Sequence, residues 1–345
     1  MAYTTIDNPA DYFEVIAYAG DGNTTQAITA NFQVDLSWIK HRSTTAAHTI
    51  QDSVRGFNAA NKLSSNENDA ENDSGGATWE NYGHVSAVSS SSFTVTRGAN
   101  TPYQTNASGV NYVAWHWKES ATAGFDIVSY TGDGSASTTI SHSLSAVPHW
   151  IIVKNRSEAT SWCVTHKSLS TDKVLRLEGT NAEGDIGDGE LDSPPASSSN
   201  FAFNNGTSGT PLKVVNESSD SYIAYLWTAK QGFSKFGSFV ANSNTDGPFV
   251  YLGFRPALVI GKCASDTNDW FMFDNKRSTF NPVDDSLYPN TNAAENTNHI
   301  IDFFSNGFKI RDSDGTVNST GNTYIYMAFA EAPFVNSKGV PANAR

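Results

Sequence analysis

Three stretches of this chain repeat one strand pattern, and this repetition constrains the fold more than any other feature. The stretches are VNYVAWHWKE (110–119), SDSYIAYLWTAK (219–230) and GNTYIYMAFAEA (321–332). Side chains of a β-strand point alternately to its two faces, so every second residue of a stretch shares a face. One face is bulky and apolar in each copy: Val113, Trp115 and Trp117; Ile223, Tyr225 and Trp227; Ile325, Met327 and Phe329. The pattern predicts half-buried strands or strands in a sandwich core.

Other residues recur in the same order. The turn glycines Gly22, Gly134 and Gly247 lie about 112 residues apart, and a fixed period of this kind marks internal repetition. Asp-Gly at each turn predicts a two-residue hairpin, because both positions favour positive φ. Each copy also carries a lysine, an aromatic residue or His, a loop glutamate and an asparagine at matched places: Lys40, Lys154 and Lys262; His48, Trp162 and Trp270; Glu71, Glu183 and Glu295; Asn106, Asn216 and Asn318.

We therefore predict an all-β fold of three tandem, homologous β-sandwich domains of the jelly-roll type. A copy of about 110 residues has room for six to eight short strands, which suits such a domain. The expected domains are residues 1–121, 122–231 and 232–334, followed by a C-terminal tail at 335–345. Two arrangements are compatible with the repeats: a pseudo-threefold assembly, and a row that forms a rod.

The composition disfavours several classes of function. The 345 residues have a formal net charge of −13 without a cluster of Lys and Arg, so we expect no nucleic-acid partner and no membrane partner. No apolar run approaches the roughly 20 residues of a membrane span, and the N-terminus lacks a signal-peptide pattern. Cys163 and Cys263 are interpreted as buried small hydrophobes rather than as a disulfide.

No set of catalytic residues stands out. His48, Asp52 and Ser53 have the residue types of a triad, but Trp162 and Trp270 replace His48 in the other copies. The loop glutamates occur once per copy without a second acid, whereas glycan hydrolysis needs two carboxylates about 5–10 Å apart. We assign these glutamates a turn-forming or capping role. The chain is therefore expected to be neither an enzyme nor a cofactor-binding protein.

One segment has the composition of a calcium-binding loop. DIGDGELD (185–192) spaces four acidic residues around glycines: Asp185, Asp188, Glu190 and Asp192. Calcium takes many oxygen ligands from such loops, but the full twelve-residue pattern is missing and the other copies lack the segment, so metal occupancy stays open. The Asn-x-Ser/Thr triplets at the three repeated asparagines are interpreted as turn residues rather than glycosylation acceptors.

Three aromatic residues fall outside the alternating pattern: Trp79, Tyr82 and Tyr103. They lie in irregular stretches rich in Gly and Asn that the other copies lack. Exposed aromatic side chains stack on sugars and contact proteins, so these residues are our candidates for contacts with a glycan or a partner chain. The alternative is that each ring packs over the edge of its own domain.

Several segments resemble a known family. YFEVIAYAGDG (12–22), WIIVKNRS (150–157), NHIIDFFSNGFKIR (298–311) and TYIYMAFAEAPF (323–334) are similar to a repeated domain of unknown function that is common in virion structural proteins of marine tailed phages, including cyanophages. The resemblance covers nearly the whole chain and implies a tail-associated or fibre-like virion protein. Some relatives stand beside concanavalin A-like lectin domains, which implies a lectin-like sandwich. No catalytic residues are established for the family.

The expected function is that of a non-enzymatic structural protein of a virion, assembled in the host cytoplasm. Its partners would be other virion proteins, further copies of itself and, for a component that touches the host, a surface glycan. Two alternatives remain open: a carbohydrate-binding receptor-recognition protein, and a head-decorating protein. A glycan depolymerase is disfavoured because the sequence shows no acid pair.

Overall fold

The computed structural model describes residues 3–73, 78–135, 137–170, 172–184, 190–191, 197–204 and 213–342. Nearly all of its regular structure is β-strand, which confirms the predicted all-β class. Two short 3-10 helices and one short α-helix complete it. Within these ranges no helix is both long enough and apolar enough to cross a membrane.

The elements fall into three groups, which we call the first, second and third repeats. The first contains η1 (Pro9–Asp11), β1 (Phe13–Ala19), β2 (Thr25–Thr29), β3 (Leu36–His41), β4 (Thr49–Asp52), η2 (Trp79–Tyr82), β5 (His84–Val88), β6 (Ser92–Thr96) and β7 (Asn111–Trp117). The second contains β8 (Phe125–Thr131), β9 (Ser137–Ser141), β10 (Trp150–Asn155), β11 (Cys163–His166), β12 (Leu175–Arg176), β13 (Glu190–Leu191), β14 (Asn200–Asn204) and β15 (Ser221–Trp227). The third contains β16 (Ser234–Val240), β17 (Phe249–Tyr251), β18 (Phe254–Cys263), β19 (Trp270–Asp274), β20 (Ile301–Phe304), β21 (Gly307–Ile310), α1 (Gly315–Asn318) and β22 (Thr323–Pro333).

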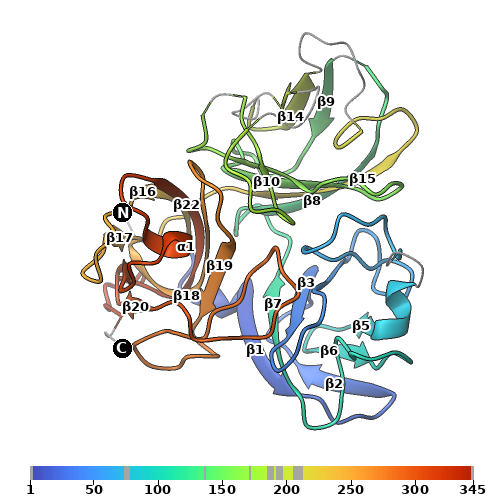
Figure 1. The fold of residues 1–345 in the computed structure, drawn as a ribbon, viewed down its shortest axis with the longest axis horizontal. Coiled ribbons are helices and arrows are strands. Elements are labelled where there is room, and N and C mark those ends of the chain that lie inside the picture. Colours follow the sequence, from blue (N-terminus) through green and yellow to red (C-terminus); the bar gives the residue numbers. More distant parts are fainter. Residues whose placement is uncertain are drawn as a thin grey trace.

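Each repeat builds one large sheet and one three-stranded sheet (Figure 1). The large sheets have the strand orders β1-β7-β3-β4, β12-β11-β10-β15-β8 and β16-β22-β18-β19. The smaller sheets are β2-β6-β5, β13-β14-β9 and β17-β21-β20. In every large sheet the first strand of the repeat pairs with its last strand, and the last strand pairs with the second large-sheet strand. The topology therefore repeats three times along the chain.

The registers of the large sheets are also equivalent. The residue at the start of each first strand lies opposite the last bulky residue of the closing strand: Phe13 opposite Trp117, Phe125 opposite Trp227, and Ser234 opposite Phe329. The repeated lysines also share one register position: Lys40 opposite Val113, Lys154 opposite Ile223, and Lys262 opposite Ile325. The lysine alignment made from the sequence is therefore confirmed by strand pairing.

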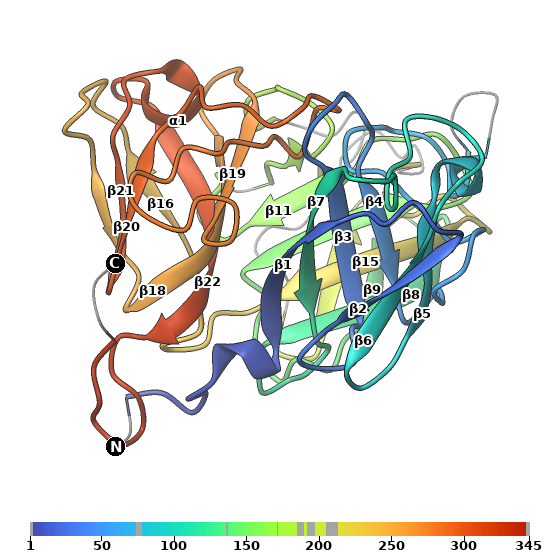
Figure 2. The ribbon, with the colours of Figure 1, turned by 90° about the horizontal axis from the view of Figure 1, so that it is seen from below.

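The closing strands β7, β15 and β22 lie toward the middle of the molecule (Figures 1 and 2). Their bulky faces meet in one core that all three repeats share. At its centre the ring of Trp117 lies 6.1 Å from that of Trp227 and 5.7 Å from that of Phe329. The opposite faces of the large sheets pack against the smaller sheets in three further cores, one per repeat. Both faces of each closing strand are therefore buried, and the three repeats surround a common centre.

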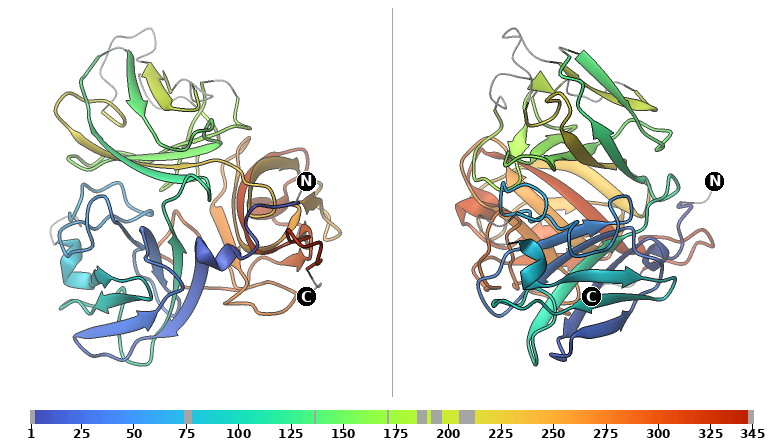
Figure 3. Two further views of the ribbon diagram at one scale, coloured as in Figure 1. Left: turned by 180° about the vertical axis from the view of Figure 1, so that it is seen from behind. Right: turned by 90° about the vertical axis from the view of Figure 1, so that its right-hand side faces the viewer.

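The N-terminal segment joins the first repeat to the third (Figure 3). Tyr3 Oη donates a hydrogen bond to Gly253 O at 2.7 Å, and Thr4 Oγ1 donates to Gln231 O at 2.8 Å. Ile6 is buried in the shared core. From the C-terminal tail, the Ser337 N–H donates to the Asp7 carboxylate at 2.7 Å. Both ends of the chain thus hold the first and third repeats together.

The predicted Asp-Gly hairpins are wrong. β1 and β2 belong to different sheets, so the turn at Gly22 carries the chain from the large sheet to the small one. Gly22 and Gly134 have φ values of 76° and 65°, but their counterpart in the third repeat is Ser243, with a φ of 51°, rather than Gly247. The nearby Asp-Gly pair in the third repeat misled the alignment. The predicted domain limits and the jelly-roll type stay predictions.

Candidate binding clefts between the repeats

Three buried lysines occupy matched positions, and two of them, Lys40 and Lys154, bond to another repeat. Lys40, Lys154 and Lys262 are each 0% exposed, and each ammonium donates to the carbonyl oxygen of the following residue at 2.6–2.8 Å. Lys40 Nζ also donates to Asn292 O of the third repeat, and Lys154 Nζ donates to Asn68 O of the first. Burial lowers the pKa of Lys40 to about 7 and the pKa values of the other two to about 8.

The matched residues His48, Trp162 and Trp270 also bond one repeat to another. Trp162 Nε1 donates to Ser64 O in the first repeat, and Trp270 Nε1 donates to Arg176 O in the second, both at 3.0 Å. The Nδ1 of His48 accepts from Trp38 Nε1, so its Nε2 carries the proton and donates to Tyr288 O of the third repeat at 3.1 Å. Burial keeps the pKa of His48 well below its usual value. Each ring thus reaches into the preceding repeat.

A buried ionic network joins the third repeat to the first. Arg277 and Asp274 have side chains that are 0% exposed, and Arg277 Nε lies 2.6 Å from Asp274 Oδ2. Arg277 also pairs with Glu295 at 3.1 Å, and Arg42 of the first repeat pairs with Glu295 at 2.6 Å. Trp115 Nε1 of the first repeat donates to Asp274 Oδ2 at 3.1 Å. Every charge in the network has an opposite partner.

The same network joins the first repeat to the second, with Tyr225 in place of Trp115. Arg55 pairs with Asp52 and with Glu71, Arg156 of the second repeat pairs with Glu71, and Tyr225 Oη donates to Asp52 Oδ2 at 2.7 Å. The turn-forming or capping role that we predicted for the loop glutamates is therefore incomplete, because Glu71 and Glu295 each link two repeats.

Among the described residues, the contact between the second and third repeats carries no such network. At the places of Asp274, Arg277 and Trp115 it has His166, Leu169 and Met327. The backbone pairing survives: Glu183 N–H donates to Ala264 O at 2.6 Å, as Glu71 N–H does to Arg156 O and Glu295 N–H to Arg42 O, both at 2.9 Å. The equivalent contact is therefore ionic between two pairs of repeats and uses neutral side chains at the matched positions between the third pair.

The triad types noted at His48, Asp52 and Ser53 are committed to separate contacts. His48 bonds Trp38 and Tyr288, whereas Asp52 pairs with Arg55. Among the described residues, no hydrogen bond joins His48 to Asp52 or to Ser53. These three side chains do not form a catalytic arrangement.

Clefts lie beside two of these contacts, between the third and first repeats and between the second and third, where the first strand of one repeat runs along the end of the preceding repeat. The second residue of that strand has equivalent register in all three: Glu14 opposite His116, Asp126 opposite Leu226, and Lys235 opposite Ala328. The facing segments are equivalent too, because one backbone N–H···O bond recurs in each: Ser53 to Asp35, Lys167 to His149, and Asn275 to Ala257. Charge nevertheless differs at these matched positions, so the shared fold does not dictate it.

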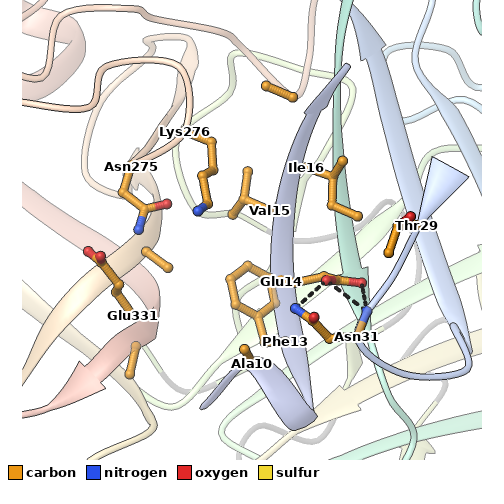
Figure 4. A pocket seen from close by; sticks show the side chains of 13 residues that line it. Ala10, Phe13, Glu14, Val15, Ile16, Thr29, Asn31, Asn275, Lys276 and Glu331 are labelled. Atoms are coloured by element: carbon orange, nitrogen blue, oxygen red, sulfur yellow. Dashed lines mark hydrogen bonds between the residues drawn. The ribbon is translucent and has the colours of Figure 1, made fainter. Parts of the chain in front are cut away.

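The cleft between the third and first repeats has a volume of about 410 Å³. Figure 4 shows Phe13 and Val15 on the side of β1 that faces the third repeat, and Glu14 on the other side. The Glu14 carboxylate accepts hydrogen bonds from the Asn31 backbone N–H at 3.2 Å and side-chain Nδ2 at 2.9 Å. Glu331, on the opposite wall, pairs with Arg255 at 3.1 Å. The acidic groups of this cleft are therefore already engaged.

The matched place between the first and second repeats contains a pair of acids, Glu119 and Asp126. Burial and the nearby Asp126 carboxyl raise the pKa of Glu119 to about 7. Such a pair has the residue types used in glycan hydrolysis. However, Asp126 is only 3% exposed, and its oxygens accept hydrogen bonds from the N–H groups of Ile127 and Ser143. A buried carboxylate occupied in this way is not open to a substrate.

The cleft between the second and third repeats is basic. It has a volume of about 350 Å³ and is lined by Tyr3, Gln231, Lys235 and Tyr251 among others. Lys235 Nζ donates to Tyr251 O at 2.6 Å and lies 5.3 Å from the centre of the Tyr251 ring. Burial and the Lys167 charge both lower the pKa of Lys235. In the described part of the chain, no carboxylate lies within ion-pair distance of either lysine.

A family model for a domain of unknown function, DUF7483, matches residues 8–333. The chain belongs to this family. The match is continuous and covers all three repeats. No curated protein matches the sequence.

The aromatic contact candidates of this DUF7483 chain lie together at the edge of the first repeat. Trp79 is 6% exposed, and Lys62 Nζ lies 5.6 Å from the centre of its ring. Tyr82 and Tyr103 are half-buried; the ring of Tyr82 lies 6.1 Å from that of Trp79, and the Arg97 guanidinium lies 5.3 Å from that of Tyr103. Trp79 thus offers little surface to a partner, and a contact role for the two tyrosines stays a prediction.

The acidic segment of the second repeat is outside what the structure describes. Asp185, Asp188 and Asp192 lie outside the described residues, and only the backbone of Glu190 is described, as part of β13. Elsewhere in the described chain, no group of three or more potential ligands could hold a metal ion.

The three repeated asparagines are buried and hydrogen-bond the turn after the first strand. The side-chain oxygens of Asn106, Asn216 and Asn318 accept from the backbone N–H groups of Asp21, Asp133 and Asn242, at 2.9–3.1 Å. A side chain held in this way cannot receive a glycan in the folded chain.

Sequence reasoning missed the residues of the basic cleft. Lys235 belongs to a first strand, Tyr251 to a small sheet and Lys167 to another repeat, so nothing in the local sequence groups them. One signal was available. When the repeats are aligned, the second residue of the first strand reads Glu14, Asp126 and Lys235, a change of sign at a position whose neighbours agree.

Proposed function

We propose that this chain is a structural component of a tailed-phage virion, tail-associated or fibre-like, built as one rigid block from three homologous β-sandwich units. The observation that carries the proposal is the shared core, where the rings of Trp117, Trp227 and Phe329 meet. A repeat that moved away from the others would expose this core to water, and each Å² of exposed apolar surface would cost about 25 cal/mol of free energy. A block of this kind suits assembly into a particle better than it suits domain motion.

The polar contacts support the same role. His, Asp and Glu are residue types that often act in catalysis in other proteins. In this chain His48, Asp52 and Glu295 bond one repeat to another. The resemblance of the sequence to virion proteins of marine tailed phages supports the placement in a particle. We propose no enzymatic step and no cofactor, and we expect incubation with bacterial polysaccharide to release no reducing ends.

Immunogold labelling of purified particles tests the proposal. Antibodies raised against the folded chain are applied to particles of the tailed phage that encodes it, with antibody pre-absorbed on the protein as the control. We expect gold on the tail or its fibres. Gold on the capsid would replace the tail assignment by the head-decorating one. If particles carry no gold while the infected-cell lysate contains the chain, the structural role is refuted.

A further inference from the structure

We propose that the cleft between the second and third repeats binds an anionic saccharide, a carboxylated or sulfated sugar whose ring packs on Tyr251 and whose acidic group pairs with Lys235 and Lys167. This inference goes beyond the structural role and does not depend on it. A chain that is purely structural would retain the fold without needing this cleft.

The first argument is charge. The protein has a net charge of −13, yet Lys235 lines this cavity, and Lys167, which lies outside the lining, is near enough for its charge to act on Lys235. The Lys167 backbone N–H donates to His149 O at 2.9 Å, and His149 Nδ1 accepts from the N–H of Ala229, which lines the cavity. Lys235 lines the same cavity from β16. Both like charges raise the energy of the empty cleft, and an anion placed between them would lower it.

The second argument is comparison within the molecule. The matched position to Lys235 is Glu14 in the first repeat and Asp126 in the second, and both of those carboxylates are occupied by N–H donors of the chain itself. A side chain needed only for folding would be expected to find a partner in the same way. Within the described ranges, Lys235 instead donates to a single carbonyl, Tyr251 O, and its ammonium has two further protons to offer.

The third argument is the shape and chemistry of the wall. Tyr251, which lines the cavity, is 49% exposed. Phe249, outside the lining but on the same face of β17, is 46% exposed. Large exposed rings are costly in water and pack well against the apolar faces of sugars, while Gln231 and the Tyr3 hydroxyl supply polar contacts for hydroxyl groups. The cavity volume is at the lower end for small-ligand sites, which favours one or two sugar units over a folded partner.

Isothermal titration calorimetry of the full chain tests the proposal with defined probes. The probes are trigalacturonate, its methyl ester, a sulfated galactan oligosaccharide and its desulfated form. We expect binding of at least one acidic probe and at least tenfold weaker binding of the matched neutral probe. Lys235→Gln and Lys167→Gln should each weaken binding at least fivefold, and Tyr251→Ala at least tenfold.

A matched control removes one charge from the opposite end of the second repeat. Lys213 is exposed and pairs with Glu158, and Lys213→Gln should leave the affinity within twofold. Failure of every acidic probe to bind the folded wild-type chain would overturn the proposal, as would equal binding of acidic and neutral probes. Hexaglutamate that binds as tightly as the sugars, with no loss in Tyr251→Ala, would overturn it in favour of an acidic protein segment. None of these results bears on whether the chain is in the virion.

Discussion

Removing Arg277 should test the ionic contact between the third and first repeats. Its side chain is 0% exposed, as is that of Asp274, to which it donates at 2.6 Å. In Arg277→Leu the Asp274 carboxylate stays buried and keeps only uncharged donors, including Trp115 Nε1. Breaking a buried pair by removing one partner costs about 3–5 kcal/mol. At about 2.1 cal/mol/K of unfolding entropy per residue, 345 cooperative residues lose roughly 4–7 °C in Tm.

The molecule itself supplies the compensating change. At the equivalent contact between the second and third repeats, His166 and Leu169 stand in place of Asp274 and Arg277. Adding Asp274→His to Arg277→Leu removes the unpaired charge and copies that neutral contact. The double variant should therefore regain more than half of the loss, because replacing a whole buried ion pair by neutral groups is often close to neutral in free energy.

Thermal and urea unfolding, followed by circular dichroism, measure both effects. Arg277→Leu should lower the free energy of unfolding by about 3–5 kcal/mol, and the double variant should lie clearly above it. A loss of less than about 1 kcal/mol in the single variant would mean that the network is not buried as described. A double variant no more stable than the single one would refute the argument from an unpaired carboxylate.

Three further outcomes are expected. Burial and Asp126 raise the pKa of Glu119 from 4.5 to about 7 in the folded chain. Between pH 4.5 and pH 7 the folded chain therefore keeps a proton that the unfolded chain releases, and the stability contributed by Glu119 should fall as the pH rises through this range. Glu119→Gln should lose that part of the pH slope in urea unfolding, and an unchanged slope would contradict the assignment. Trp162→Phe leaves the carbonyls of Ser64 and Glu67 without their indole donor, and should cost about 1–3 kcal/mol by the same measurement; a neutral effect would argue against this link between repeats. Residues 122–231 expressed alone expose their side of the shared core and should bind a hydrophobic dye and self-associate; a stable monomer with dispersed NMR signals would count against that core.

The sequence predicts the strands well because their signals are local. Alternation with a period of two identified the bulky faces of β7, β15 and β22, and all nine of the residues assigned to those faces lie in the shared core. The buried lysines were aligned correctly because each ends an apolar run in the same phase. The turn glycines were aligned correctly only in two repeats, since in the third a Ser takes the positive φ.

The shared core and the clefts were beyond prediction for a physical reason. A buried face has the same composition whether a small sheet or another repeat covers it. The alternation of apolar and polar residues therefore could not distinguish a row of domains from a pseudo-threefold assembly. Ion pairs such as Arg42 with Glu295 join residues 253 positions apart, and single residues carry no trace of such a partner. The basic cleft likewise combines three distant segments. Only the change of charge between aligned repeats was visible beforehand.

Differential scanning calorimetry of the intact chain tests most directly whether the three repeats form one block around a common core. We predict a single transition whose calorimetric and van't Hoff enthalpies agree, at roughly 240 kcal/mol for 345 residues near 60 °C. Two or three separable transitions that divide that enthalpy between them would show repeats that unfold independently and would contradict the shared core.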